Sequence, residues 1–569
     1  MCLLSSRATL AFQSQNDTFN STFRLTAQQI SAANLSAATT HNVEVALQYE
    51  RSNNAGSLIQ NDPFYTVPDH YNLNNLPPPG TILKVEDHTN LTLYTIPNSL
   101  SLSRFLYVTE TYNGTSVPAS AYVLWPYLPR SFPNLTRCAA NTPPTTQPLY
   151  PVVALAHGTS GQTQACVPSG LRNLWDHFNE PFPLALQGYA VVTPDYAGLG
   201  VPNVTSPYFV FPAQANDLFH AVAAAQAEWP ALLSKQFVVA GQSQGGGVAW
   251  AAAQRQYDRP VEGYLGTMAA SPFTDALAAI AADSGIENNA RVSGIAQGLG
   301  SVLPGFQLSD WLTPLGIARW NLIHAIKGCG TTSGQLAAAE SGALPILKDG
   351  WNETWSADWY RQATMNGGKP FAGPKLVIQG TEDGNANEPT TSRSVNQTCA
   401  LFPESQLQYV RFENITHVPV LLAGQHTWLG WIHDRFAGVA VPKRCTQQTL
   451  SPPREINGAA FAGWSSATWF VEYNLYGIYR FSLLLKHAGM NISKQNHQDP
   501  TLTKVIRRSS MSKIALTLPL SSLEIHAKQT PGACEPWYRA HIHPTTHSRC
   551  FIDPDLRPPS QSSQMPHRD

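Results

Sequence analysis

Two patterns of apolar and polar positions divide the chain. Between about residues 81 and 125, short segments alternate apolar and polar side chains, with Pro and Asn-Gly turns between them. A period of two is typical of β-strands, and the short connections favour antiparallel pairing. The predicted strands are Thr81–Asp87, Leu91–Ile96, Arg104–Glu110 and Ala119–Trp125.

From about residue 150 onward, the apolar segments are short and continuous. Strands buried on both faces have this character, and their alternation with helices indicates a parallel sheet. Helices are expected over Ala213–Trp229, Gln244–Tyr257 and Val420–Phe436. The predicted strands are Val152–Ala156, Tyr189–Thr193, Phe237–Ala240, Lys375–Gln379 and Leu407–Phe412. The expected fold class is therefore α/β, with a mostly parallel sheet flanked by helices.

The same patterns suggest four parts of the chain. Residues 1–75 are polar and are expected to form an N-terminal arm with one helix near Ala27–Ala38. Residues 76–271 and 371–475 form the predicted α/β domain, and the helical residues 272–370 interrupt it as an inserted cap or lid. The last part, 476–569, lacks hydrophobic periodicity and is expected to be a disordered tail.

The composition narrows the function classes. The chain has 569 residues, a formal net charge of -1 and only 13% charged residues, which argues against a nucleic-acid partner. Its 43% hydrophobic residues are enough for a large core. A transmembrane segment is not expected, because the most apolar late stretch is interrupted by Glu472 and Arg480.

Asparagine sequons and cysteine spacing favour a secreted glycoprotein. N-x-[ST] sites accept glycans only in secreted chains. None of the eight cysteines forms a CxxC pair, so long-range disulfides are expected and zinc ribbons are excluded. The alternative is a general Asn, Ser and Thr bias in loops. The sequons begin at Asn16, Asn20, Asn34, Asn90, Asn113, Asn134, Asn203, Asn352, Asn396, Asn414 and Asn491.

The strongest chemical signal is Gly241-Gln-Ser-Gln-Gly245, which lies between a predicted strand and a predicted helix. In this context the motif indicates a nucleophile elbow, a strained turn that exposes the oxygen of Ser243 at the edge of a sheet. The glycines permit close approach of the neighbouring backbone. The alternative interpretation is an ordinary Gly-rich helix start.

A serine nucleophile needs a base and an acid, which in this fold follow it in the order acid, then His. Asp383 comes just after the strand Lys375–Gln379, and His417 follows the strand Leu407–Phe412. Both are the expected partners of Ser243. The competing candidates are Glu382 and Asp195 for the acid, and His426 and His433 for the base.

Two backbone N–H groups should bind the oxyanion of the tetrahedral intermediate. The residue after the nucleophile, Gln244, is one expected donor. The other should come from the loop after an early strand, where His157 is followed by Gly158 and Thr159. An ordinary glycine turn is the alternative for that loop.

Together these motifs resemble the fungal secretory lipase family of α/β-hydrolases, the lipase A type, over about residues 60–475. Gln242 departs from many relatives, which carry His before the serine. The resemblance implies a Ser243–Asp383–His417 triad, a lid over 272–370 and hydrolysis of carboxylic esters, often triacylglycerols, outside the cell. The matching segments are His157–Gly161, Gly188–Gly200, Gly241–Gly247, Gln379–Asp383, Thr416–His417 and Trp431–Gly438.

The family pattern also suggests two disulfides. Cys399 lies between acid and base and Cys445 follows the helix after His417, so this pair would pin the catalytic loop. Cys138 and Cys329 would tie the strand region to the cap.

The function expected from the sequence is a secreted serine hydrolase that cleaves carboxylic esters, with triacylglycerol lipase activity. It needs no metal and no organic cofactor, and its partner is an ester or lipid substrate, including one at a lipid–water interface. The alternatives are a narrow carboxylesterase, a serine peptidase and a non-catalytic binding relative. Five cap tryptophans would either form an apolar lid surface or pack the cap core: Trp311, Trp320, Trp351, Trp355 and Trp359. The oligomeric state is not predicted.

Overall fold

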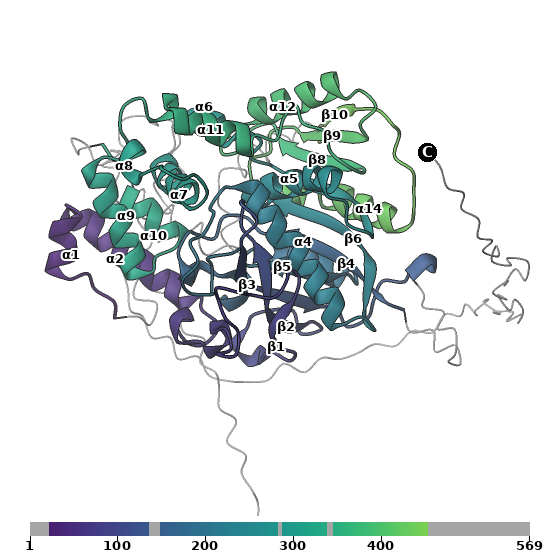
Figure 1. Ribbon diagram of the computed structural model, residues 1–569. Helices are drawn as coiled ribbons and strands as arrows, with labels where there is room; N and C mark the ends of the chain where they lie inside the picture. Colours follow the sequence, from purple (N-terminus) through teal and green to yellow (C-terminus); the bar gives the residue numbers. More distant parts are fainter. Residues whose placement is uncertain (1–21, 136–147, 283–286, 338–344, 453–569) are drawn as a thin grey trace, which may run out of the picture. The chain divides into compact units, whose positions relative to one another are not determined.

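A computed structural model describes residues 22–135, 148–282, 287–337 and 345–452 (Figure 1). All of them lie in the first of the two units into which the chain divides, 1–490 and 491–569. The predicted tail, 476–569, lies outside the described residues.

The described strands form one sheet in the order β1-β2-β3-β5-β4-β6-β7-β8-β9-β10. Its β1-to-β5 end is antiparallel, and from β5 to β10 every neighbouring pair is parallel. Figure 1 shows β1 and β2 at one end of the sheet and β9 and β10 at the other. The strands are β1 (Ile82–Glu86), β2 (Ser101–Glu110), β3 (Ser116–Trp125), β4 (Tyr150–Ala156), β5 (Ala190–Pro194), β6 (Leu233–Gln242), β7 (Tyr264–Ala270), β8 (Lys375–Gly380), β9 (Leu407–Phe412) and β10 (Thr446–Leu450).

The strand prediction was wrong at one place and incomplete at two others. Residues 91–96 do not form a strand, because the Asn90 side chain accepts the N–H of Thr92 and starts a 3-10 turn, Leu91–Leu93. The Ala- and Gly-containing β7 and the polar edge strand β10 were not predicted.

Helices cover both faces of the sheet. Because side chains alternate along a strand, β4 sends Val152 and Ala154 into a core with α4 and α5, and Val153 and Leu155 into the opposite core with α3 and α14. The helices outside the cap are α1 (Ala27–Ala32), α2 (Ala37–Ser52), α3 (Pro181–Leu186), α4 (Phe211–Glu228), α5 (Gln244–Asp258), α12 (Glu388–Leu401), α13 (Pro419–Ala423) and α14 (Gln425–Phe436).

A helical cap is inserted between β7 and β8. Its described elements are α6 (Ala276–Ala282), α7 (Glu287–Val302), α8 (Leu308–Trp311), α9 (Pro314–Ile326), α10 (Gly330–Ala337) and α11 (Trp355–Thr364). The two N-terminal helices, α1 and α2, lie beside α9 and α10 in Figure 1. Leu47 of α2 shares an apolar cluster with Ile323 and Leu336 of the cap. The N-terminal segment that reads as a polar arm is therefore packed against the cap.

The structure joins Cys399 to Cys445, the pairing that the resemblance implies. The expected Cys138–Cys329 pair is wrong, because Cys329 is bonded to Cys166 instead. Cys138 lies outside the described residues. The sequence offered no measure of distance, whereas the Cα atoms of Cys166 and Cys329 lie 5.4 Å apart, within the range that a disulfide spans.

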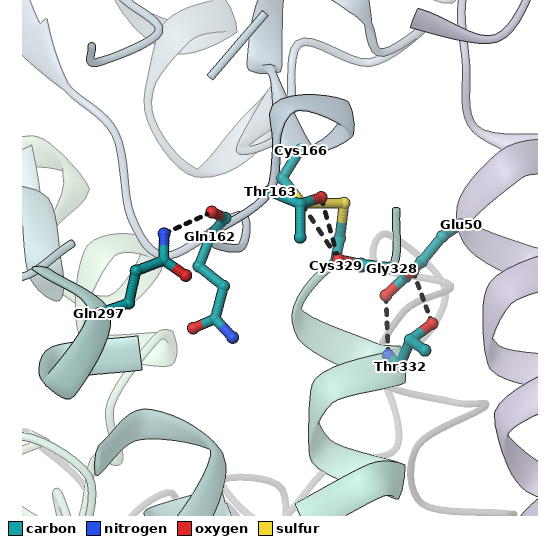
Figure 2. Close-up of a disulfide and its surroundings, with 8 residues drawn as sticks. All are labelled: Glu50, Gln162, Thr163, Cys166, Gln297, Gly328, Cys329 and Thr332. Atoms are coloured by element: carbon teal, nitrogen blue, oxygen red, sulfur yellow. Dashed lines mark hydrogen bonds between the residues drawn. A yellow bond between two sulfur atoms is a disulfide. The ribbon is translucent and has the colours of Figure 1, made fainter. Parts of the chain in front are cut away.

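The Cys166–Cys329 disulfide links the loop after β4 to the start of α10 (Figure 2). Beside it, Thr163 Oγ1 donates a hydrogen bond to the Gly328 carbonyl over 3.1 Å. Glu50 of α2 accepts the Thr332 N–H over 2.8 Å. Carboxylate oxygens stabilise the unpaired N–H groups at a helix start, so Glu50 fixes α10 from the N-terminal segment.

Candidate active site

Ser243 stands between β6 and α5 in a strained conformation, with φ 61 and ψ -121. A non-glycine residue adopts such angles only where its surroundings enforce them, often at functional sites. A Cβ on Gly245 would lie 1.8 Å from the Ala156 carbonyl oxygen, and one on Gly241 would lie 2.4 Å from that of Gly245. Only glycine fits at both positions, and the turn that results has the form of a nucleophile elbow.

His417 lies in the loop between β9 and α13, within reach of this serine. Its Nε2 is 2.8 Å from Ser243 Oγ. Its backbone carbonyl accepts hydrogen bonds from Ser271 Oγ over 3.0 Å and Gln242 Nε2 over 3.3 Å. The Phe273 ring meets the imidazole edge to face at 6.1 Å. These contacts hold the imidazole toward the serine oxygen.

Asp383 follows β8 and contacts the other side of the same imidazole. Its Oδ2 is 2.9 Å and its Oδ1 3.0 Å from His417 Nδ1. Oδ1 also accepts the N–H groups of Asn385 and Ala386, both over 3.0 Å, and Oδ2 accepts Gln379 Nε2 over 2.8 Å. The carboxylate is buried and fully oriented, which suits it to hold the imidazole in one tautomer.

In the described part of the chain, the alternative candidates for the acid and the base make no hydrogen bond with Ser243 or His417. Asp195 accepts hydrogen bonds from Ser120 Oγ, Ser169 Oγ and the Ser169 N–H at 2.6–2.7 Å, and burial raises its pKa to about 6. Glu382 is exposed. His426 and His433 lie on α14, where their side chains contact Thr427 and Asp434, and the His433 ring also packs against Phe132. Sequence order and the position after a predicted strand therefore selected the three residues that the structure brings together.

The predicted oxyanion donors are only partly available. Gln244 is the first residue of α5, so its N–H has no partner inside the helix. Thr159 Oγ1 donates to Gln244 Oε1 over 2.9 Å and brings the two loops together. The Gly158 N–H, in contrast, donates to Asp176 Oδ2 over 3.2 Å. This contact leaves Gln244 and Thr159 as the candidate donors and gives Gly158 a different role.

A cavity of about 250 Å³ opens at Ser243 and His417, between the sheet edge and the cap. Polar side chains from both sides line it, including Gln162, Asp176 and Arg291. Among the described residues, no group of three or more His, Cys, Asp or Glu is placed to hold a metal ion. None of the described helices has the length and apolarity needed to cross a membrane.

The sheet order, the flanking helices and the inserted cap define an α/β-hydrolase fold. No protein-family model and no curated protein sequence matches this chain. Among solved structures, it is similar to Candida antarctica lipase A in its closed state, with a TM-score of 0.54 and 15% identity, over 72% of this chain and 96% of the lipase. A second structure of that lipase gives the same TM-score and identity, over 72% and 95%. At this identity the similarity establishes the fold.

Proposed function

We propose that this protein is a serine hydrolase of carboxylic esters. The observation that carries the proposal is the continuous contact from Ser243 Oγ through His417 to Asp383, at 2.8 and 2.9 Å, on a strained elbow. A serine hydroxyl becomes a strong nucleophile when a neighbouring imidazole takes its proton and a carboxylate orients that imidazole.

The geometry supports a two-stage reaction. Ser243 Oγ attacks the ester carbonyl while His417 Nε2 accepts its proton, and Asp383 stabilises the imidazolium. The N–H groups of Gln244 and Thr159 bind the oxyanion. His417 then protonates the leaving alcohol, and an acyl group stays on Ser243. Water, deprotonated by His417, releases the acid and restores the serine.

The finer proposal is a triacylglycerol lipase of the fungal secretory lipase A type. It rests on the motif resemblance and on a second cavity in the cap. That cavity holds about 20 Å³, shares Gln162, Ala290 and Ser333 with the first, and is also lined by Ile323 and Leu336. A long acyl chain would meet these apolar side chains only after the cap opens further.

The second candidate is a narrow carboxylesterase, which the polar side chains of Gln162, Asp176 and Arg291 in the main cavity favour. The cap tryptophans do not decide between the two. Trp311 is fully buried, Trp320, Trp351 and Trp359 are half-buried, and Trp355 is exposed. The tryptophans therefore mostly pack the cap. The choice between lipase and carboxylesterase must come from a comparison of substrates.

A series of p-nitrophenyl esters from acetate to palmitate separates the two candidates. Each methylene buried in an apolar site contributes about 0.8 kcal/mol, which is about a fourfold rise in kcat/KM. If the protein is a lipase, we expect kcat/KM to keep rising for acyl chains longer than butyrate. We also expect the rate of triacylglycerol hydrolysis to increase once the substrate forms an emulsion. A maximum at acetate or butyrate, with no activity on the emulsion, would refute the lipase and favour the esterase.

We also propose that the protein is secreted and glycosylated. Five of its sequon asparagines are exposed in the described residues: Asn34, Asn90, Asn113, Asn203 and Asn396. Two disulfides support an oxidising compartment. After expression through a secretory pathway, treatment with an N-glycosidase should lower the mass of the protein, and an unchanged mass would contradict glycosylation.

A further inference from the structure

A strained segment borders the proposed active site. Leu174, Trp175 and His177 are all non-glycine residues with positive φ, at 53, 68 and 31. Each such conformation is strained and persists only where the surrounding packing enforces it. Trp175 and Asp176 line the cavity that opens at Ser243. The strain therefore lies beside the reacting atoms.

Asp176 connects this segment to the oxyanion loop. Its Oδ2 accepts the Gly158 N–H over 3.2 Å. The residue that follows Gly158 is Thr159, the candidate oxyanion donor. A hydrogen bond to one N–H fixes the orientation of that peptide and limits the backbone of the residue that follows. Asp176 thus influences where the Thr159 N–H points.

Glu180 is a second acid in the same segment, and its carboxyl group has no hydrogen-bond partner among the described residues. The residue is 1% exposed. Burying an unpaired carboxylate is costly, so such a group retains a proton. Burial, and then the charge of Asp176, raise the pKa of Glu180 well above its usual range. Burial also raises the pKa of Asp176 to about 7.

The groups around the two acids carry no balancing positive charge. Burial lowers the pKa of both His157 and His177 to about 4, so both are neutral near pH 7. Among the described residues no ion pair joins a cation to Asp176 or Glu180, although Arg172 lies in the same segment. The other titratable neighbours are the phenols of Tyr122 and Tyr196.

We propose that Asp176 positions the Gly158–Thr159 turn for oxyanion binding and that the buried Glu180 four residues later keeps its proton. The oxyanion role rests on the proposed function. With Glu180 neutral, Asp176 accepts the Gly158 N–H without a second negative charge in the segment. Loss of the Glu180 proton leaves a buried carboxylate with no hydrogen-bond donor in the described part of the chain, and its desolvation destabilises the segment.

The pH dependence follows from the direction of the shifts. A carboxyl whose folded pKa is raised stabilises the fold at pH values below its unfolded pKa, and this contribution is lost as pH rises. For Asp176 the loss runs from its ordinary value near 4 to about 7. The raised pKa of Glu180 extends the loss to higher pH. Both Tm and kcat are therefore expected to fall on the alkaline side.

The pH dependence of Tm, measured for wild type and for Glu180→Gln, tests whether Glu180 keeps its proton. The amide of the variant is neutral at every pH and therefore mimics the protonated carboxyl group. We expect its Tm to fall less than that of wild type between pH 5 and pH 9, and the alkaline limb of kcat to move to higher pH. Phe178→Ala, an exposed change in the same segment, should keep the wild-type pH dependence. Identical curves for Glu180→Gln and wild type would overturn the proposal that Glu180 keeps its proton.

The kinetics of Asp176→Ala and Asp176→Asn test the positioning role. Since loss of one oxyanion donor costs about 10²–10³ in kcat, we expect a displaced donor in Asp176→Ala to cost about tenfold or more, with KM little changed. Asp176→Asn still accepts the Gly158 N–H and should recover most of the kcat. Wild-type kcat in Asp176→Ala, or no recovery in Asp176→Asn, would overturn the role.

The two proposals fail in different ways. Full activity of Ser243→Ala would refute the proposed function and, with it, the oxyanion role of Asp176. The Tm curves need no activity, so they decide the protonation of Glu180 in either case. If Asp176→Ala does not fold, Asp176→Asn decides by its kcat, because a loss of tenfold or more in that variant would overturn the positioning role.

Discussion

Ser243→Ala is expected to lower kcat for ester hydrolysis by on the order of 10⁴–10⁶-fold. The variant loses the oxygen that forms the acyl-enzyme bond. His417 and Asp383 then have no serine hydroxyl to activate. The fold should survive, because alanine keeps the Cβ atom and the strained φ of 61 already present at this position.

Thermal unfolding provides the control for this variant. The Tm of Ser243→Ala should stay close to that of wild type, because the substitution removes one hydrogen bond to His417 and creates no apolar cavity. Hydrolysis at more than a tenth of the wild-type rate, by a preparation free of other esterases, would contradict the role of Ser243.

Asp383→Asn has the second largest expected effect, a loss of about 10⁴-fold in kcat. The Asp383 oxygens accept three donors besides His417: two backbone N–H groups and Gln379 Nε2. An asparagine amide must either turn its NH₂ group toward those donors or present it to His417 Nδ1. The second arrangement requires the tautomer with the proton on Nε2, which cannot accept the serine proton.

Glu382→Gln is the matched control for this substitution. Glu382 is the neighbouring acid, is exposed and was one of the two alternative candidates in the sequence. We expect kcat close to wild type for Glu382→Gln. A large loss of kcat in Glu382→Gln, together with near-normal kcat in Asp383→Asn, would show that Asp383 is not the catalytic acid.

The triad residues could be predicted because their signals are local and ordered. A strand, a glycine turn and a helix surround Ser243, and Asp383 and His417 each follow an apolar strand in the expected order. The carboxyl ends of these parallel strands lie at one edge of the sheet. Residues that follow the strands are therefore close together in the folded protein. The cap was predicted by the absence of a strand pattern.

Other features depend on distances that the sequence does not encode. Cys166 and Cys138 both precede the cap, and only the folded loop places Cys166 beside Cys329. Asp176 and Glu180 belong to no motif, and their burial depends on the path of a strained loop. The edge strand β10, Thr446–Leu450, carries polar side chains and, among the described strands, pairs only with β9, so its sequence lacks the apolar pattern of a central strand.

Reaction with a fluorophosphonate, followed by peptide mapping, tests the role of Ser243 most directly. An activated serine attacks the phosphorus of the probe, and the resulting adduct is stable. We predict one adduct per chain, on the peptide that carries Ser243, with loss of esterase activity in proportion to labelling and no adduct in His417→Ala. An active, folded protein that stays unlabelled at Ser243, or that is labelled at another serine as activity is lost, would contradict the proposed mechanism.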